Sequence, residues 1–291
     1  MAGIYDYIPL DKSWIIRMGV LDITNSYKDI REFIEKQEDL GDDLKALGRI
    51  SKNWDSNNPL DIGESGTLYR FIRFATWKLE KKNELIKRGT LKDRKMCDNP
   101  EIVNWPLEKL LTLDGGTSQW ATAAILMGST EKIEEPDDKI QLAYGAVSHW
   151  NKKRIFHGNW EPRYDKTINR QAAYFVDALR KGLREINLVP WRSEDYCFAR
   201  AFEAISKERG KELFPQIVNH ESNRIKEMEK VIKSANNDEY IDSKDHRVVQ
   251  AYAMRQLFFG NEIKVKNKNA VNKSWPQFWD FMEYAKGLKK N

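Results

Sequence analysis

The stretch Gly63-Glu-Ser-Gly-Thr-Leu-Tyr-Arg-Phe-Ile-Arg-Phe-Ala75 joins a short polar turn directly to a helix pattern. Apolar residues recur after the turn with the period of an amphipathic helix, at Leu68, Phe71, Ile72 and Ala75. Ser65 stands where a helix-capping hydroxyl is expected. A helix N-terminus also carries unpaired N–H groups and a partial positive charge, which suit an anion. The stretch therefore predicts a helix start, and its turn has two readings: a cap alone, or a cap that also holds an anionic ligand.

The same pairing of a polar signature with a following helix pattern occurs six times. Three signatures lie in each half of the chain, at 12–17, 65–67, 115–119, 193–195, 220–224 and 245–247. Further helices are expected at 139–150 and 171–183, and a strand at 262–266, where apolar and polar residues alternate. The stretch 152–163 contains Gly, Pro and several charges and is interpreted as a crossover. Repeated strand–helix units in two sets of three predict a two-domain α/β protein whose helix N-termini face a shared cleft.

The composition is that of a soluble globular protein. The chain has 291 residues, of which 41% are hydrophobic and 32% charged. It has no apolar run near the ~18 residues that span a bilayer, and no signal-peptide pattern at its N-terminus, so a cytoplasmic protein is expected. Cys97 and Cys197 lie far apart and the four histidines are scattered, which predicts neither a disulfide framework nor a zinc site. The net charge of +5 is mild and suits small anionic ligands as readily as nucleic acid.

Charged and hydroxyl-bearing residues form a series of short motifs in these signatures and at 273–278. Their motifs are Lys12-Ser13-x-x-x-Arg17, Ser65-Gly66-Thr67-x-x-Arg70, Thr117-Ser118-Gln119, Asp195, Glu221-Ser222-Asn223-Arg224, Asp245-His246-Arg247 and Lys273-Ser274-Trp275-Pro276-Gln277-Phe278. In this order, the motifs resemble those of the 5-enolpyruvylshikimate-3-phosphate synthase family of enolpyruvyl transferases. Any one motif occurs by chance, so the order from residue 12 to residue 278 carries the resemblance.

The resemblance implies transfer of an enolpyruvyl group from phosphoenolpyruvate to a hydroxyl of a phosphorylated acceptor. The implied catalytic residues are Lys12, Asp195 and Glu221, with Asp195 taking the hydroxyl proton and Lys12 or Glu221 handling the methylene proton. The residues implied to bind phosphoenolpyruvate are Lys12, Gly66, Arg94, Arg224, Arg247 and Lys273. Arginine forks suit the two anionic ends of this substrate because charge-assisted hydrogen bonds are strong.

The residues implied to bind the acceptor are Ser13, Arg17, Thr117, Ser118, Gln119, Asp195 and His220. Shikimate-3-phosphate is the acceptor that the family implies, which points to aromatic amino acid biosynthesis. Several departures from the family pattern lie on the acceptor side, namely His220, Asn223 and the segment Glu135-Pro136-Asp137. Glu64 is also an acid where the family has a neutral residue. A different phosphorylated acceptor therefore remains an alternative.

The resemblance also implies a fold. It is an inside-out α/β barrel with repeated βαβαββ units, here trimmed because the chain is short for the family. The expected domains are 11–155, and 1–10 together with 156–291, with a strand within 1–10 and the active site in the cleft between the domains. The chemistry needs neither a metal nor an organic cofactor, and a monomer without nucleic-acid or membrane partners is expected.

Each motif also has a structural interpretation. Ser65, Thr117, Ser193 and Asp245 are good helix caps in the absence of any ligand. Arginines one turn into a helix are usually solvated, so Arg17 and Arg70 taken alone predict surface residues. A trimmed relative that binds a phosphorylated ligand or a partner protein without catalysis is therefore the second alternative, and nucleic-acid binding ranks last.

Overall fold

Two hydrophobic cores divide the chain into two units. The computed structural model describes residues 3–156, 163–219, 222–237 and 239–289. The N-terminal unit is Leu10–Arg163, and the C-terminal unit combines Met1–Pro9 with Tyr164–Asn291. Each unit has its own core of buried aliphatic and aromatic side chains. The sequence-based domains end at residues 10 and 155, and the contacts divide the chain at Pro9/Leu10 and Arg163/Tyr164.

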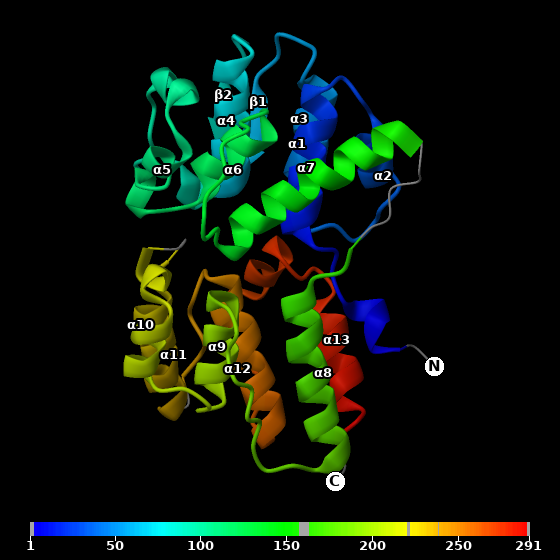
Figure 1. The fold of residues 1–291 in the computed structure, drawn as a ribbon. Helices are drawn as coiled ribbons and strands as arrows, with labels where there is room; N and C mark the ends of the chain where they lie inside the picture. The colour runs from blue at the N-terminus through cyan, green and yellow to red at the C-terminus, as the bar shows by residue number, and fades with distance from the viewer. Residues whose placement is uncertain (1–2, 157–162, 220–221, 238, 290–291) are drawn as a thin grey trace. The chain divides into compact units, whose positions relative to one another are not determined.

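The N-terminal unit contains seven α-helices and one small sheet among its described residues (Figure 1). In chain order its helices and strands are α1 Lys12–Thr24, α2 Asp29–Glu35, α3 Asp42–Asn53, β1 Leu60–Gly63, α4 Gly66–Lys78, β2 Leu85–Lys87, α5 Leu107–Leu110, α6 Gln119–Leu126 and α7 Asp138–Phe156. Short 3-10 helices lie at Gly89–Leu91, Pro100–Asn104 and Leu113–Gly115. The strands pair in parallel, with Leu60 opposite Leu85, and α4 connects them. This β–α–β unit is the α/β structure of the described chain.

Helix α1 is the central helix of the N-terminal unit. All ten residues from Trp14 to Ile23 are buried, as expected of a helix that is surrounded by protein on every side. Its neighbours are α2, α3, α4, α6 and α7. The carboxylate of Asp11 caps the helix by accepting a hydrogen bond from the Trp14 amide at 3.1 Å.

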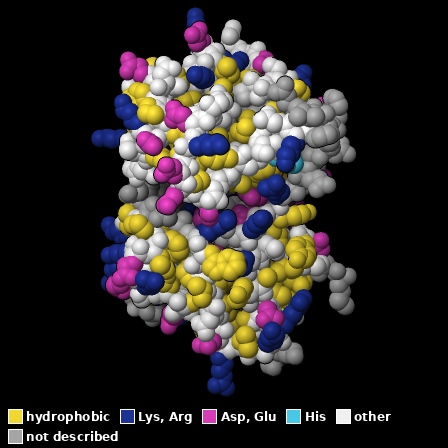
Figure 2. Space-filling model, viewed as in Figure 1, with side chains coloured by type: hydrophobic (Ala, Val, Ile, Leu, Met, Phe, Trp, Pro, Cys, Tyr) yellow, Lys and Arg dark blue, Asp and Glu magenta, His cyan; other side chains and the backbone are white. Residues whose placement is uncertain are grey.

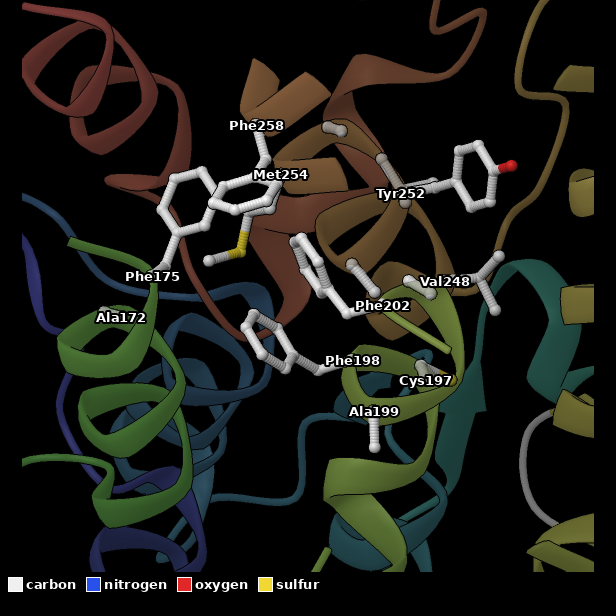
Figure 3. Packing of buried hydrophobic residues seen from close by; sticks show 14 of the residues in the cluster. Ala172, Phe175, Cys197, Phe198, Ala199, Phe202, Val248, Tyr252, Met254 and Phe258 are labelled. Carbon is white, nitrogen blue, oxygen red and sulfur yellow. The ribbon is translucent and has the colours of Figure 1, made fainter. Parts of the chain in front are cut away.

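The C-terminal unit is helical throughout its named elements. These are the 3-10 helix Ile4–Tyr7, α8 Lys166–Lys181, the 3-10 helix Ser193–Asp195, α9 Tyr196–Ala201, α10 Lys207–Leu213, the 3-10 helix Pro215–Asn219, α11 Arg224–Asn236, α12 His246–Phe259, the 3-10 helix Lys268–Lys273 and α13 Phe278–Lys286. The buried helix α12 packs against α9, α11 and α13. Figure 3 shows Phe175, Phe198, Phe202 and Phe258 gathered with Met254 in this core, and the Phe198 and Phe202 ring centroids are 4.8 Å apart.

The described residues of the six polar signatures all lie at helix starts, before or within the first turns of α1, α4, α6, α9, α11 and α12. Two caps are confirmed by side-chain hydrogen bonds. The Ser65 hydroxyl accepts from the Leu68 amide at 3.3 Å, and the Asp245 carboxylate accepts from the Arg247 amide at 2.9 Å. The expected helices at 139–150 and 171–183 correspond to α7 and to most of α8.

Two expected strands are wrong. Within 262–266 the alternating residues form one isolated bridge, in which Val265 pairs with Ile241, because the chain around Ile241 offers no longer strand for pairing. Near the N-terminus, the described residues of 1–10 contain the 3-10 helix Ile4–Tyr7 instead of a strand. Across the described ranges the inside-out barrel is not shown, since β1 and β2 are the only strands longer than a single bridge.

The surface in Figure 2 carries Lys and Arg interspersed with Asp and Glu over the face in view. Among the helices described, none has both the length and the apolar character needed to cross a membrane.

Candidate functional site

Two arginines converge on Gly66 at the N-terminus of α4. A Cβ atom placed on Gly66 would lie 3.3 Å from NH1 of Arg70 and 3.3 Å from NH1 of Arg94. Gln119 completes the group, because its Oε1 accepts from Arg70 NH1 at 2.6 Å and its Nε2 donates to the Thr67 hydroxyl at 3.0 Å. We call Gly66, Thr67, Arg70, Arg94 and Gln119 the Gly66 cluster. It combines the positive end of a 13-residue helix with two guanidinium groups.

Asp114 anchors one of these two arginines. Its carboxylate accepts from Arg70 Nε at 2.8 Å, from the Trp120 indole at 2.9 Å and from the Cys97 amide at 2.8 Å. Its backbone is left-handed (φ 49°, ψ 40°), a conformation that aspartate tolerates better than most residues. The turn thus directs an almost fully buried carboxylate at Arg70.

The charges of the cluster are only partly balanced. Burial lowers the pKa of Arg70, the hydrogen bond and charge of Asp114 oppose that change, and the nearby Arg94 lowers the pKa further. Among the described residues, no carboxylate forms an ion pair with Arg94. A bound anion would therefore relieve the repulsion between two neighbouring guanidinium groups.

Glu64 does not form an ion pair with Arg70 or Arg94 in the described chain. Its Oε2 accepts from the Thr90 amide and from the Thr90 hydroxyl, each at 3.2 Å. The same hydroxyl accepts from Arg94 NH2 at 3.2 Å. The acid that departs from the family pattern is thus engaged by the turn that carries Thr90.

The first signature lies in the same unit, on α1. Lys12 Nζ is paired with the buried carboxylate of Asp43 at 3.0 Å. Arg17 donates to the backbone carbonyls of Ser13 at 2.8 Å and Lys139 at 3.2 Å, and its Nε is buried without a hydrogen-bond partner in the described structure. Burial lowers the pKa of Arg17 to about 10, against the attraction of the Asp11 and Asp137 charges.

The signature before α6 contributes mainly through Gln119. Ser118 is buried and forms no side-chain cap, while the Thr117 hydroxyl accepts from the Gln119 amide at 3.4 Å. Thr117 and Ser118 therefore lie at the start of α6, and Gln119 reaches the Gly66 cluster.

In the C-terminal unit, Asp245 gathers the polar side chains that surround the starts of α11 and α12. Its carboxylate accepts from Arg224 Nε at 3.1 Å, from the Ser222 hydroxyl at 2.7 Å and from the Arg247 amide at 2.9 Å. Burial raises the pKa of this carboxyl, but the charges of Arg224 and His246 and the hydrogen bonds outweigh burial and hold the pKa below its usual range.

Arg247 is buried beside this group. Its NH2 lies 4.0 Å from Asp165 Oδ2, and its NH1 is buried with no hydrogen-bond partner among the residues that the structure describes. The structure therefore brings together Arg224 and Arg247, two of the arginines that the resemblance implies for phosphoenolpyruvate.

Asp195 is held by a separate set of donors. Its Oδ1 accepts from Gln171 Nε2 at 3.0 Å, and its Oδ2 accepts from Arg170 and from the amides of Trp191 at 3.1 Å and Arg192 at 3.2 Å. Three of these four hydrogen bonds end on Oδ2 and one ends on Oδ1, so the two oxygens are unequally engaged. In this arrangement Asp195 anchors the loop before α9.

Three further residues that the resemblance implies are Lys273, His220 and Glu221. Lys273 is half-buried at the end of the 3-10 helix Lys268–Lys273. His220 and Glu221 lie outside the described residues. The described parts of the chain hold no group of three or more His, Cys, Asp or Glu side chains that could bind a metal ion.

Sequence reasoning gave no role to Arg70, Asp114 and Arg170. The interpretation of Arg17 and Arg70 as solvated is wrong, because Arg17 is buried and the Arg70 side chain is only 12% exposed. The Asp-Gly-Gly turn at 114–116 signals a left-handed backbone, but nothing local links Asp114 to a residue 44 positions earlier.

Each unit thus contains its own group of cationic side chains, one around Gly66 and the other around Asp245. Comparison of the chain with protein-family models, with curated proteins and with solved structures finds no match.

Proposed function

We propose that the protein transfers an enolpyruvyl group from phosphoenolpyruvate to a hydroxyl of a phosphorylated acceptor and releases phosphate. The observation that carries the proposal is the convergence of Arg70 and Arg94 on Gly66 at the N-terminus of α4. Two guanidinium groups and a helix N-terminus suit a small, doubly anionic substrate. The ordered motifs supply the identity of that substrate.

The Asp245 group supports the same proposal. Arg224 is paired with Asp245, so its charge is largely balanced. Arg247 retains a buried NH1 with no hydrogen-bond partner in the described ranges. A buried, unsatisfied guanidinium nitrogen is costly, and an anionic oxygen would satisfy it.

The chemistry needs two proton transfers. The acceptor hydroxyl oxygen bonds to C2 of phosphoenolpyruvate while its proton goes to a base and C3 receives a proton from an acid. The C2–O bond to phosphate then breaks, C3 loses a proton, and the enolpyruvyl ether and inorganic phosphate remain. The resemblance assigns the base to Asp195 and the methylene acid to Lys12 or Glu221. Within Asp195, Oδ1 is the better placed oxygen for the proton, because it accepts one hydrogen bond in the described structure and Oδ2 accepts three.

The proposal concerns the substrate and the reaction and does not depend on an inside-out barrel, because β1 and β2 are the only strands longer than a single bridge in the described ranges. A crystal structure with phosphoenolpyruvate tests the proposal. The substrate should be bound by Arg94 or by Arg247, and a substrate bound by neither would contradict the assignment.

Phosphorus NMR tests the activity. We expect inorganic phosphate to appear when phosphoenolpyruvate is mixed with the protein and the correct acceptor, beginning with shikimate-3-phosphate and continuing with phosphorylated sugars, cyclitols and nucleotides. Arg94→Ala should lower the rate by at least about tenfold, since it removes a charge-assisted contact to substrate. Glu108→Ala, an exposed acid on α5, serves as the matched control.

Binding without transfer is the second candidate, and it is favoured by the structural role of Asp195, whose carboxylate accepts four hydrogen bonds that hold the loop before α9. This candidate predicts that calorimetry detects phosphoenolpyruvate binding, that Arg94→Ala abolishes the binding, and that no acceptor releases phosphate. Phosphate release that Asp195→Asn removes would instead support the transferase.

A further inference from the structure

Arg94 is connected to Glu64 through one hydroxyl group. The Thr90 Oγ atom lies 3.2 Å from Arg94 NH2 and 3.2 Å from Glu64 Oε2. A guanidinium group only donates and an ionised carboxylate only accepts, so the direction of both hydrogen bonds is fixed. Arg94 donates to Thr90, and Thr90 donates to Glu64.

Glu64 also holds in place the turn that carries Thr90. The Thr90 amide donates to the same Oε2 at 3.2 Å, and the Arg88 amide donates to the Gly63 carbonyl at 2.8 Å. Gly89 has a φ of +46°, and the Glu64 carboxylate occupies the position where a Gly89 Cβ would lie. Glycine is therefore required on steric and conformational grounds for this turn to close over Glu64.

This connection holds Arg94 without neutralising it. In the described structure Arg70 pairs directly with Asp114, whereas Arg94 meets no carboxylate within ion-pair distance. A direct Glu64–Arg94 ion pair would compete with an anionic ligand for the guanidinium. An intervening hydroxyl restrains the side chain and leaves its charge available.

We propose that Glu64 and Thr90 are positioning residues that direct Arg94 toward the anion at the N-terminus of α4. The inference rests on the proposed function, and it assigns a role to the acid that departs from the family pattern. An arginine side chain loses many rotamers when it binds a ligand, so restraint before binding increases affinity.

The first experiment follows Arg94 without any ligand, by NMR of the guanidinium groups of ¹³C,¹⁵N-arginine-labelled protein. The Arg94 resonance is assigned by its loss in Arg94→Lys. We expect Thr90→Val to accelerate rotation of the Arg94 guanidinium about its Nε–Cζ bond at least severalfold, and Thr90→Ser to retain the slow rotation. Thr112→Val, which removes an exposed hydroxyl that donates to the Lys109 carbonyl, is the matched control. Equal rotation in wild type and Thr90→Val would overturn the inference.

The second experiment measures phosphoenolpyruvate affinity by calorimetry in the same variants. Thr90→Val should weaken binding about fivefold, the typical effect of one hydrogen bond, and Thr90→Ser should restore it. Glu64→Ala should weaken binding at least as much as Thr90→Val. The double variant should bind phosphoenolpyruvate no more weakly than Glu64→Ala alone, because both substitutions act on Arg94 through the same pair of hydrogen bonds. In turnover assays KM for phosphoenolpyruvate should rise while kcat changes little.

The two readouts separate the inference from the proposed function. If the affinity of Thr90→Val for phosphoenolpyruvate is within twofold of the wild-type affinity, the inference is overturned and the proposed function is unaffected. A wild-type protein that restrains Arg94 but binds no phosphoenolpyruvate overturns the proposed function, while the positioning of Arg94 stands on the first readout.

Discussion

Arg70 and Asp114 form a nearly buried ion pair, with Nε and Oδ2 at 2.8 Å, although 44 positions separate them in the chain. The same carboxylate accepts hydrogen bonds from the Trp120 indole and the Cys97 amide. Asp114 therefore connects α4 to α6 and to the loop that contains Cys97. Arg70 also donates a hydrogen bond to Gln119, whose side-chain amide donates to the Thr67 hydroxyl. The N-terminus of α4 is therefore built from three separate segments.

Asp114→Asn should destabilise the protein. The amide retains tolerance of the left-handed backbone but removes the negative charge from a largely buried arginine, and losing one partner of such a pair costs about 2 to 4 kcal/mol. Urea denaturation of wild type and variant measures the difference. Asp98→Asn, which affects the far more exposed partner of Arg73, should cost under about 1 kcal/mol. Equal effects of the two substitutions would contradict the role of Asp114.

Gly66→Ala should separate stability from binding. The new methyl group meets the flexible ends of Arg70 and Arg94, which can shift, so the free energy of unfolding should change by less than about 1 kcal/mol. Phosphoenolpyruvate affinity should fall about tenfold, because the methyl group occupies the space beside both guanidinium groups at the helix N-terminus, where the anion would bind. Calorimetry and urea denaturation measure the two quantities.

Gly145→Ala is the control for that experiment. Gly145 lies within α7 and a Cβ there meets nothing within 4 Å, so the substitution should raise stability by about 0.5 to 1 kcal/mol and leave affinity unchanged. A loss of affinity in Gly145→Ala as large as that in Gly66→Ala would show that the effect is not local.

The Asp245 carboxyl should make the protein sensitive to acid. Its folded-state pKa lies below the unfolded value of about 3.9, so its contribution to stability is fully present above that pH and is lost as the pH falls below it. Urea denaturation at pH 7, 5, 4 and 3 measures the trend. The wild type should lose stability over the lower part of this range faster than Asp245→Asn.

Asp245→Asn should also be less stable at pH 7, by about 3 to 5 kcal/mol, since Arg224 loses its buried partner. The stability difference between the proteins should narrow toward pH 3. A difference that stays constant from pH 7 to pH 3 would show that the Asp245 pKa is not depressed in the folded protein.

The two thiols should differ in reactivity. Burial raises the pKa of Cys197 to about 12, so its thiolate is scarce and inaccessible in the folded protein. Cys97 is half-buried and reaches solvent. An aromatic disulfide reagent should modify one thiol in the native protein and two in urea, and Cys97→Ala should leave none to react in the native state. Rapid native modification of Cys197 would contradict its placement in the core.

The local sequence predicted several elements well because their causes are local. Ser65 and Asp245 cap α4 and α12 through hydrogen bonds to amides two or three residues away. The strand at 262–266 was wrong because pairing depends on a distant segment. Alternation places Val265 inside, but in the described residues it forms a single bridge, to Ile241. Periodicity specifies which face is buried and does not supply a partner strand.

By itself the sequence determined where helices begin, which residues are apolar at helical spacing, and the order of the charged motifs. The tertiary structure decided which charges face one another. Arg17 and Arg70 follow the same local rule for a helical arginine, yet both are covered by segments remote in sequence. Glu64 likewise acquires its role only when the turn at Thr90 folds against it. Ion pairs and hydrogen-bond relays depend on distances between segments, and those distances are set when the cores pack.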